Sequence, residues 1–272
     1  MALRLIKVTA IVLLLVAAVQ GEQRTDLVKA QLVADTTAIR PGEQFTVGVL
    51  LNIAPQWHVY WLNPGDSGIA TSIRFNVPAG YEVGELRWPV PKRFIASGIV
   101  GYGYEEQVLL SATVQAPADA RPGQSVQITA QADWLCCREE CVQGGAKLSL
   151  TLPVRDRTEP AHAELFDRWR RRLPVDAEEP GSPVTVTQSR PGNIALDWRA
   201  HVKNVEFYPA TSSALELTEI SVEHSGRQSQ VRYQAQVYDQ SKVRDGRARG
   251  LVVYEEPDGQ RRGVWVAVQV KE

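Results

Sequence analysis

The segment Arg40-Pro-Gly-Glu-Gln-Phe-Thr-Val-Gly-Val-Leu-Leu-Asn-Ile53 contains the pattern that decides the fold class. A Pro-Gly turn signal is followed at once by a run rich in apolar and β-branched residues, which is typical of a short strand between turns. The pattern recurs along the first half of the chain and predicts strands at 27–34, 44–53, 72–77, 82–88, 107–115, 125–132 and 146–154. Short strands at this spacing predict a β-sandwich.

The same pattern returns near the C-terminus, where we predict strands at 184–188, 193–198, 202–208, 214–222, 230–238, 250–254 and 264–270. The last of them alternates cleanly, with valines on one face and Trp265, Ala267 and Gln269 on the other. These strands predict a second sandwich. We expect this region to fold as its own sandwich. Because it contains no cysteine, we also expect it to contribute no redox chemistry.

A different pattern separates the two strand-rich regions. Leu165, Phe166, Trp169 and Leu173 recur at three- and four-residue spacing, which predicts a short amphipathic helix over 159–173 with its arginines on a solvated face. Residues 174–183 have the Pro, Gly and acidic composition of a linker. The expected division is 22–156 for the first sandwich, 157–183 for helix and linker, and 184–272 for the second sandwich.

The N-terminus has the composition of a secretory signal peptide. Arg4 and Lys7 precede an apolar run from Ala10 to Val19, which is shorter than the about twenty residues that a membrane-spanning helix requires. We therefore expect residues 1–21 to be removed and the mature protein to be soluble in an oxidising compartment. The alternative is an uncleaved anchor.

Overall composition excludes some functional classes. The chain has 272 residues, with 30 Lys and Arg against 31 Asp and Glu, and no block of basic residues. A protein that grips nucleic acid needs a positive field to neutralise phosphates. Nucleic acid is therefore not an expected partner.

All three cysteines lie in Trp134-Leu-Cys136-Cys137-Arg-Glu-Glu-Cys141. A vicinal Cys136–Cys137 bridge would strain the peptide, and neighbours in a strand face opposite sides, so we expect Cys137 to pair with Cys141 and Cys136 to be a free, buried thiol. A short loop constrains the unfolded chain little, so such a bridge is more easily reduced than a long-range structural one. This property suits thiol exchange.

The cysteines admit three other interpretations. The first is a purely structural, loop-closing disulfide. The second is a metal site, but zinc favours spaced pairs of Cys or His ligands, and copper handling favours Met and His clusters, whereas Met1 is the only methionine. The third, covalent haem attachment, would need a Cys-x-x-Cys-His motif, which the sequence lacks. No metal and no cofactor are expected.

A second dense region is Trp57-His-Val-Tyr-Trp61-Leu-Asn-Pro-Gly-Asp66-Ser-Gly68. Its tryptophans fit a core aromatic cluster before a turn, and His58 fits either a structural histidine or an acid–base group beside a thiol. A Ser67, His58 and Asp66 triad is not expected from residues so close in sequence, because triad members converge from separate elements. A third region, Gly98 to Glu106, predicts a mobile loop in which Tyr102 and Tyr104 cover the cysteine pair. The alternative is that both tyrosines pack into the sandwich edge.

Several of these motifs together resemble the N-terminal periplasmic domain of the DsbD thiol:disulfide interchange family, especially its ScsB-like branch. The resemblance over residues 27–154 rests on the Trp57 to Gly68 motif, then Trp88-Pro-x-Pro91, then Tyr102-Gly-Tyr-Glu105, then Asp133-Trp-Leu-x-Cys137-x-x-x-Cys141. Beyond that range it continues more loosely through Glu206-Phe-Tyr-Pro209.

The resemblance implies immunoglobulin-like sandwiches, so the fold expected is all-β, with two immunoglobulin-like β-sandwich domains joined by a short helix and linker. It implies Cys137 and Cys141 as the catalytic pair, Tyr102 and Tyr104 as a cap loop, and supporting roles for Trp57, His58, Trp61, Asp66 and Trp134.

The resemblance also implies a function, thiol:disulfide oxidoreductase activity as a periplasmic electron relay. Electrons would pass from a membrane-embedded thiol reductant to periplasmic thioredoxin-like proteins, with cytochrome c biogenesis among the processes served. Family members commonly continue into transmembrane and thioredoxin-like domains, so here the reductant is expected to be a separate protein. The alternative function is a noncatalytic periplasmic interaction module with a structural disulfide.

Overall fold

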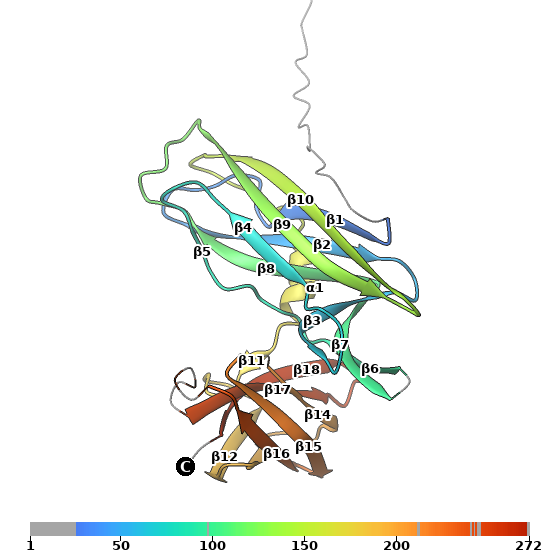
Figure 1. Cartoon of the computed structure of the whole chain (residues 1–272). Helices are drawn as coiled ribbons and strands as arrows, with labels where there is room; N and C mark the ends of the chain where they lie inside the picture. Colours follow the sequence, from blue (N-terminus) through green and yellow to red (C-terminus); the bar gives the residue numbers. More distant parts are fainter. Residues whose placement is uncertain are drawn as a thin grey trace, which may run out of the picture.

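The computed structural model describes residues 26–96, 98–210, 213–239, 241, 243 and 246–270. They form four β-sheets and one helix, α1 (Ala163–Arg170), and Figure 1 shows the sheets gathered into an upper and a lower body. The all-β fold class is therefore confirmed. The predicted signal peptide, residues 1–21, lies outside the described residues. No helix in the described part of the chain is long and apolar enough to cross a membrane.

The first sandwich pairs a four-stranded sheet with a six-stranded sheet. The smaller sheet has the order β1 (Val28–Ala34), β2 (Gln44–Ile53), β8 (Gln107–Gln115), β5 (Glu82–Val83). The larger sheet has the order β10 (Cys141–Pro153), β9 (Ser125–Cys137), β3 (His58–Gly65), β7 (Ile99–Glu105), β6 (Lys92–Ala96), and β4 (Ser72–Asn76) pairs with β9.

The second sandwich consists of two four-stranded sheets. One has the order β11 (Val175–Asp176), β18 (Arg261–Gln269), β17 (Arg247–Glu255), β14 (Lys203–Pro209). The other has the order β12 (Val184–Arg190), β13 (Asn193–Trp198), β16 (Gln228–Val237), β15 (Leu215–Ser225). The two residues of β11 pair in parallel with β18. Part of the segment predicted as a linker, residues 174–183, therefore belongs to the second sandwich.

Alternation of side chains explains most of these strands. In β18 the three valines predicted to share a face are buried in the second core, at Val264, Val266 and Val268. In β9 every second residue from Val126 to Trp134 is buried in the first core. An alternating strand buries one face against the opposite sheet and leaves the other free. The outer face of β9 is therefore available for chemistry.

Several segments of the first sandwich differ from the sequence-based predictions, and the strand predicted at 82–88 is only β5 (Glu82–Val83). Strands β9 and β10 continue beyond the predicted bounds to Cys137 and back from Cys141, which makes one long hairpin. The segment predicted as a mobile loop, 98–106, is mostly strand β7. Its glycines allow close packing, because a Cβ atom on Gly103 would lie 2.1 Å from the Val59 carbonyl oxygen and one on Gly101 would lie 2.2 Å from the Phe94 ring.

Helix α1 is shorter than the predicted 159–173 and packs on the first sandwich. Residues before it are extended instead, since Thr37 N donates to Glu159 O at 2.9 Å and Ala161 N donates to Asp35 O at 2.8 Å. Phe166 and Trp169 are buried in the core of the first sandwich. The helix thus belongs to the first body and does not serve as a free connector.

The two sandwiches are joined by an apolar junction. Trp61 of β3 stacks on Trp265 of β18, with ring centroids 5.8 Å apart and planes 20° apart, and Tyr102 of β7 lies 4.5 Å from Tyr208 of β14. Around the aromatic rings, Asn63 Nδ2 donates to the Pro209 carbonyl at 2.8 Å. The core of the first sandwich therefore continues into the second.

Candidate functional site

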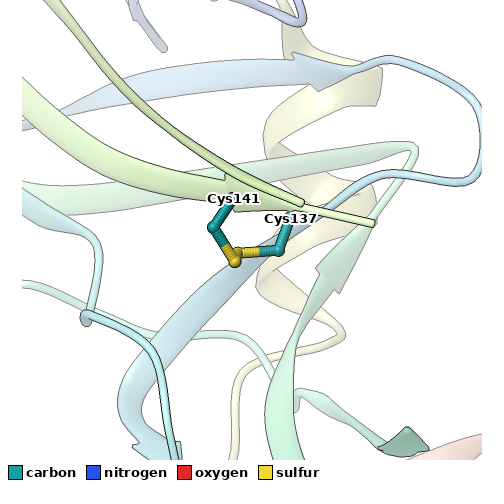
Figure 2. The surroundings of a disulfide bond; sticks show 2 residues. All are labelled: Cys137 and Cys141. Carbon is teal, nitrogen blue, oxygen red and sulfur yellow. A yellow bond between two sulfur atoms is a disulfide. The ribbon is translucent and has the colours of Figure 1, made fainter. Parts of the chain in front are cut away.

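The disulfide lies at the end of the β9–β10 hairpin. Cys137 is the last residue of β9, Cys141 is the first of β10, and the two are direct register partners. Their sulfurs are bonded and their Cα atoms lie 4.1 Å apart, as drawn in Figure 2. Cys136 is free. The predicted pairing is therefore confirmed, and the bridge closes a short exposed loop, 138–140.

The two bonded cysteines differ in exposure. Cys137 is 2% exposed, whereas Cys141 lies at the surface. Access to the sulfur is one of the factors that set the rate of thiol exchange. Of the two bonded residues, Cys141 is therefore the more accessible from solvent.

Cys136 lies on the opposite face of β9 from the disulfide. Its register partner in β3 is Val59, and both side chains are fully buried in the core. Burial raises the pKa of the Cys136 thiol to about 11. A thiol with so high a pKa stays protonated at neutral pH, and the thiolate is the reactive form. Cys136 is therefore a packing residue in this structure.

His58 shares the outer face with Cys137, since the two are register partners in neighbouring strands. Its Nε2 is buried without a hydrogen-bond partner. Burial lowers the pKa of His58, and the nearby Glu105 carboxylate acts in the opposite direction. The imidazole is therefore neutral at pH 7 and lies beside the disulfide as a polar group able to accept a hydrogen bond.

The residue that sequence analysis missed is Phe94 of β6. Its ring lies 4.2 Å from the His58 ring and 6.2 Å from the Tyr60 ring. Phe94 takes no part in the core of the first sandwich and reaches across Gly101 to this outer face. The one sequence signal for it was the glycine opposite, because a residue without a side chain leaves room for a ring. Phe94, His58 and Tyr60 form what we call the outer aromatic cluster, beside the disulfide.

Tyr102 and Tyr104 do not cover the disulfide, which corrects the predicted cap. Both are buried, at 8% and 5% exposure, and both pack into the core on the opposite face of the sheet from Cys137. The Tyr104 hydroxyl donates to the Pro89 carbonyl at 2.7 Å, and the Tyr102 ring packs on Tyr208. Residues of a strand alternate between faces, so the even-numbered positions of β7 point inward.

The remaining candidate residues surround the site without touching the sulfurs. Trp57 and Trp134 are buried in the core beneath the hairpin end, and the Arg138 guanidinium lies 5.4 Å above the Trp57 ring. Trp61 belongs to the junction between the sandwiches. Asp66 anchors β7 to the loop after β3, because its carboxylate accepts a hydrogen bond from Val100 N at 2.8 Å. Within the described residues, no group of three His, Cys, Asp or Glu side chains is arranged to hold a metal.

Comparison with known proteins gives two informative matches. Residues 24–153 match the family model for the N-terminal region of thiol:disulfide interchange protein DsbD. The N-terminal periplasmic domain of ScsB from Proteus mirabilis superposes with a TM-score of 0.62 at 17% identity, covering 93% of this chain and 99% of that one. The sporulation control protein Spo0M from Bacillus subtilis reaches a TM-score of 0.25 at 9% identity, over 89% of this chain and 91% of that one. A search among curated proteins finds no match.

Proposed function

Residues 24–153 belong to the DsbD N-terminal family, and from that premise we propose that the Cys137–Cys141 pair performs thiol–disulfide interchange in the periplasm. The pair would relay electrons between a membrane-embedded thiol reductant and periplasmic thioredoxin-like proteins. The observation that carries the proposal is the disulfide itself, which closes a short hairpin end and joins an exposed cysteine to a buried one.

The different exposure of Cys141 and Cys137 supports an order of steps. A reductant thiolate attacks the Cys141 Sγ, a mixed disulfide forms, and the Cys137 sulfur leaves with the electron pair of the broken bond. The second thiol of the reductant then attacks its own sulfur in the mixed disulfide and releases Cys141. The reductant is left oxidised by two electrons, and the cysteine pair is reduced by two electrons and takes up two protons.

The second half of the cycle uses the same geometry. The Cys141 thiolate attacks the disulfide of an oxidised thioredoxin-like protein, and Cys137 then resolves the mixed disulfide. The reduced partner leaves, and the Cys137–Cys141 bond is restored. Because exposure decides which sulfur a protein partner can reach, the same cysteine serves both half-reactions.

The equilibrium reduction potential tests this function against a structural disulfide. Structural disulfides in secreted proteins have potentials below about −300 mV, and exchangeable ones lie higher. We expect the Cys137–Cys141 couple to lie above that value when it is equilibrated with glutathione or dithiothreitol buffers and its thiols are counted by mass spectrometry. A potential below about −300 mV would instead support a noncatalytic interaction module.

The contact between Phe94 and His58, the register partner of Cys137, leads to a second expectation. The outer aromatic cluster should screen the disulfide from small thiols. Replacing Phe94 with alanine removes the ring that lies on His58, and we expect reduction by dithiothreitol to become about three- to tenfold faster. The rate is followed by quenching with an alkylating reagent and measuring intact mass.

Phe75→Ala is the matched control for this variant. Phe75 is a half-buried phenylalanine of the same sheet, but its register partner is Ala130, far along β9 from the cysteines. Its loss lowers stability without opening the face beside the disulfide. Equal reduction rates in folded Phe94→Ala and Phe75→Ala proteins would assign Phe94 to packing alone.

A further inference from the structure

The β6–β7 hairpin carries groups on both of its faces. Phe94 on the outer face lies against His58, the register partner of Cys137. Tyr102 on the inner face lies against Tyr208 of the second sandwich. Figure 1 shows this hairpin at the boundary between the two bodies, near β18. One short ribbon therefore connects the second sandwich to the surroundings of the disulfide.

The hairpin is held unevenly by its own sheet, because Tyr102 and Tyr104 of β7 are anchored in the core whereas β6 lies at the edge. Strand β6 is an edge strand whose neighbour in the sheet is β7. Strand β7 pairs with β3 from His58 to Tyr60 and again at Gly65, and a register shift interrupts the pairing between these two positions. Tyr60 of β3 pairs with Gly103 of β7, and Gly65 of β3 pairs with Gly101 of β7. The ladder to the rest of the sheet is thus broken next to Tyr102.

The second sandwich contacts the hairpin near this interruption. Arg261 of β18 donates from its guanidinium Nη2 to the Pro91 carbonyl at 3.3 Å, just before β6 begins. The same nitrogen contacts the Tyr208 hydroxyl at 2.9 Å and the Glu206 carboxylate at 3.4 Å. Tyr208 in turn donates to Glu206 at 2.8 Å, and its ring packs on Tyr102. Arg261, Tyr208 and Glu206 form what we call the junction triad.

We propose that the second sandwich acts through the junction triad as a clamp on the β6–β7 hairpin, and so controls how readily thiols reach the Cys137–Cys141 disulfide. Arg261 and Tyr208 are positioning residues in this scheme, since they touch neither sulfur. The proposal rests on the proposed exchange function for its biological meaning, but it concerns access to the bond, which can be measured separately.

The physical basis is local opening. An edge segment held by few hydrogen bonds opens more often than the fold as a whole unfolds. When β6 moves outward while Tyr104 of β7 stays in the core, the Phe94 ring leaves His58 and uncovers the face beside Cys137. Contacts that stabilise the closed hairpin lower the population of this open form. A partner that bound the second sandwich and loosened the triad would raise it.

Arg261→Ala in the full chain tests the clamp. The side chain is partly exposed, so its removal leaves no large cavity, yet it deletes the bonds to Pro91 and Tyr208. We expect reduction of the disulfide by dithiothreitol to become about fivefold faster, the order of change for losing one hydrogen bond from the closed state. Amide hydrogen exchange in the β6–β7 hairpin should accelerate with it, while the melting temperature changes little.

Arg232→Ala is the matched control. Arg232 is also a partly exposed arginine of the second sandwich with a carboxylate partner, Glu223, but it lies on β16 in the sheet that does not face the junction. The proposal predicts unchanged reduction and hairpin exchange rates in this variant. Equal acceleration in both variants, or an unchanged reduction rate in folded Arg261→Ala, would overturn the clamp.

Tyr208→Phe provides an independent variant that keeps the buried ring and removes only the hydroxyl of the triad. The proposal predicts faster reduction of the disulfide by dithiothreitol in this variant as well. If Arg261→Ala fails to fold, an unchanged reduction rate in folded Tyr208→Phe would overturn the clamp. Dithiothreitol needs no protein partner, so the result is separate from the exchange function. Failure to exchange with thioredoxin-like proteins would reject the function, and unchanged access in both variants would reject the clamp.

Discussion

Replacing Cys137 with serine is expected to abolish turnover and to turn the protein into a trap for its partner. The variant retains Cys141, whose side chain lies at the surface, as its reactive thiol. This thiol can still attack the disulfide of a thioredoxin-like protein, but no neighbouring thiol remains to resolve the mixed disulfide. Cys136 does not substitute for it, because it lies on the other face of β9.

The reciprocal variant, Cys141→Ser, is expected to trap at least about tenfold less. Its remaining sulfur belongs to Cys137, which is 2% exposed, and exchange requires access to the attacking sulfur. Both variants are incubated with an oxidised thioredoxin-like protein, quenched with acid and analysed by non-reducing electrophoresis and intact mass. Cys136→Ser, which retains the pair, is the control and should turn over normally. Stronger trapping by Cys141→Ser would assign the outward sulfur to Cys137.

Deleting the second sandwich is expected to cost much of the stability of the first. Trp61 is fully buried, and its ring contacts are with Trp265, Tyr208 and Tyr102. Removing residues 184–272 exposes Trp61 and Tyr102 to water. An aromatic side chain buries about 150–250 Å², at about 25 cal/mol per Å². With both rings partly exposed and their neighbours uncovered, the free energy of unfolding should fall by about 3–6 kcal/mol, against about 5–15 kcal/mol for a typical domain.

Urea denaturation of the 22–183 fragment beside the full chain measures this loss. Trp265→Ala in the full chain is the comparison, since it removes one side of the Trp61 stack and should cost only part of the same energy. Equal unfolding midpoints for the first sandwich in the fragment and the full chain would mean that the junction contributes no stability. The second sandwich would then be dispensable for the stability of the first.

Strand positions were predictable where turn residues flank a single apolar run in the sequence. The bounds of β2 and β8 coincide with the predicted runs, because a Pro-Gly turn signal precedes β2, Pro117 follows β8, and apolar residues fill both interiors. The prediction of a mobile loop at residues 98–106, which form most of strand β7, was wrong because a glycine in the sequence has two meanings. It favours mobile loops, but it also permits the close approach that Gly103 makes to the Val59 carbonyl.

The site was predictable in its sulfur chemistry but not in its surroundings. The cysteine pairing followed from spacing and strand geometry, both of which are local. Phe94 lies beside His58 because β6, β7 and β3 pair in space, and no local pattern reports that relation. The junction did leave a signal. Trp265 occupies the outward face of an alternating strand, and a large aromatic residue there indicates a second surface that covers it.

The place of the disulfide in the β9–β10 ladder bears on the proposed exchange function. The bridge joins two residues that thirteen-residue strands already hold opposite each other, and only four positions separate them in sequence. Opening such a bond frees no long stretch of chain, and in the chain-entropy account it forfeits only about 2 kcal/mol. We therefore expect the oxidised and reduced forms to share one architecture. In the proposed relay, electron transfer would then be uncoupled from refolding, and each turnover would end with the molecule ready for the next.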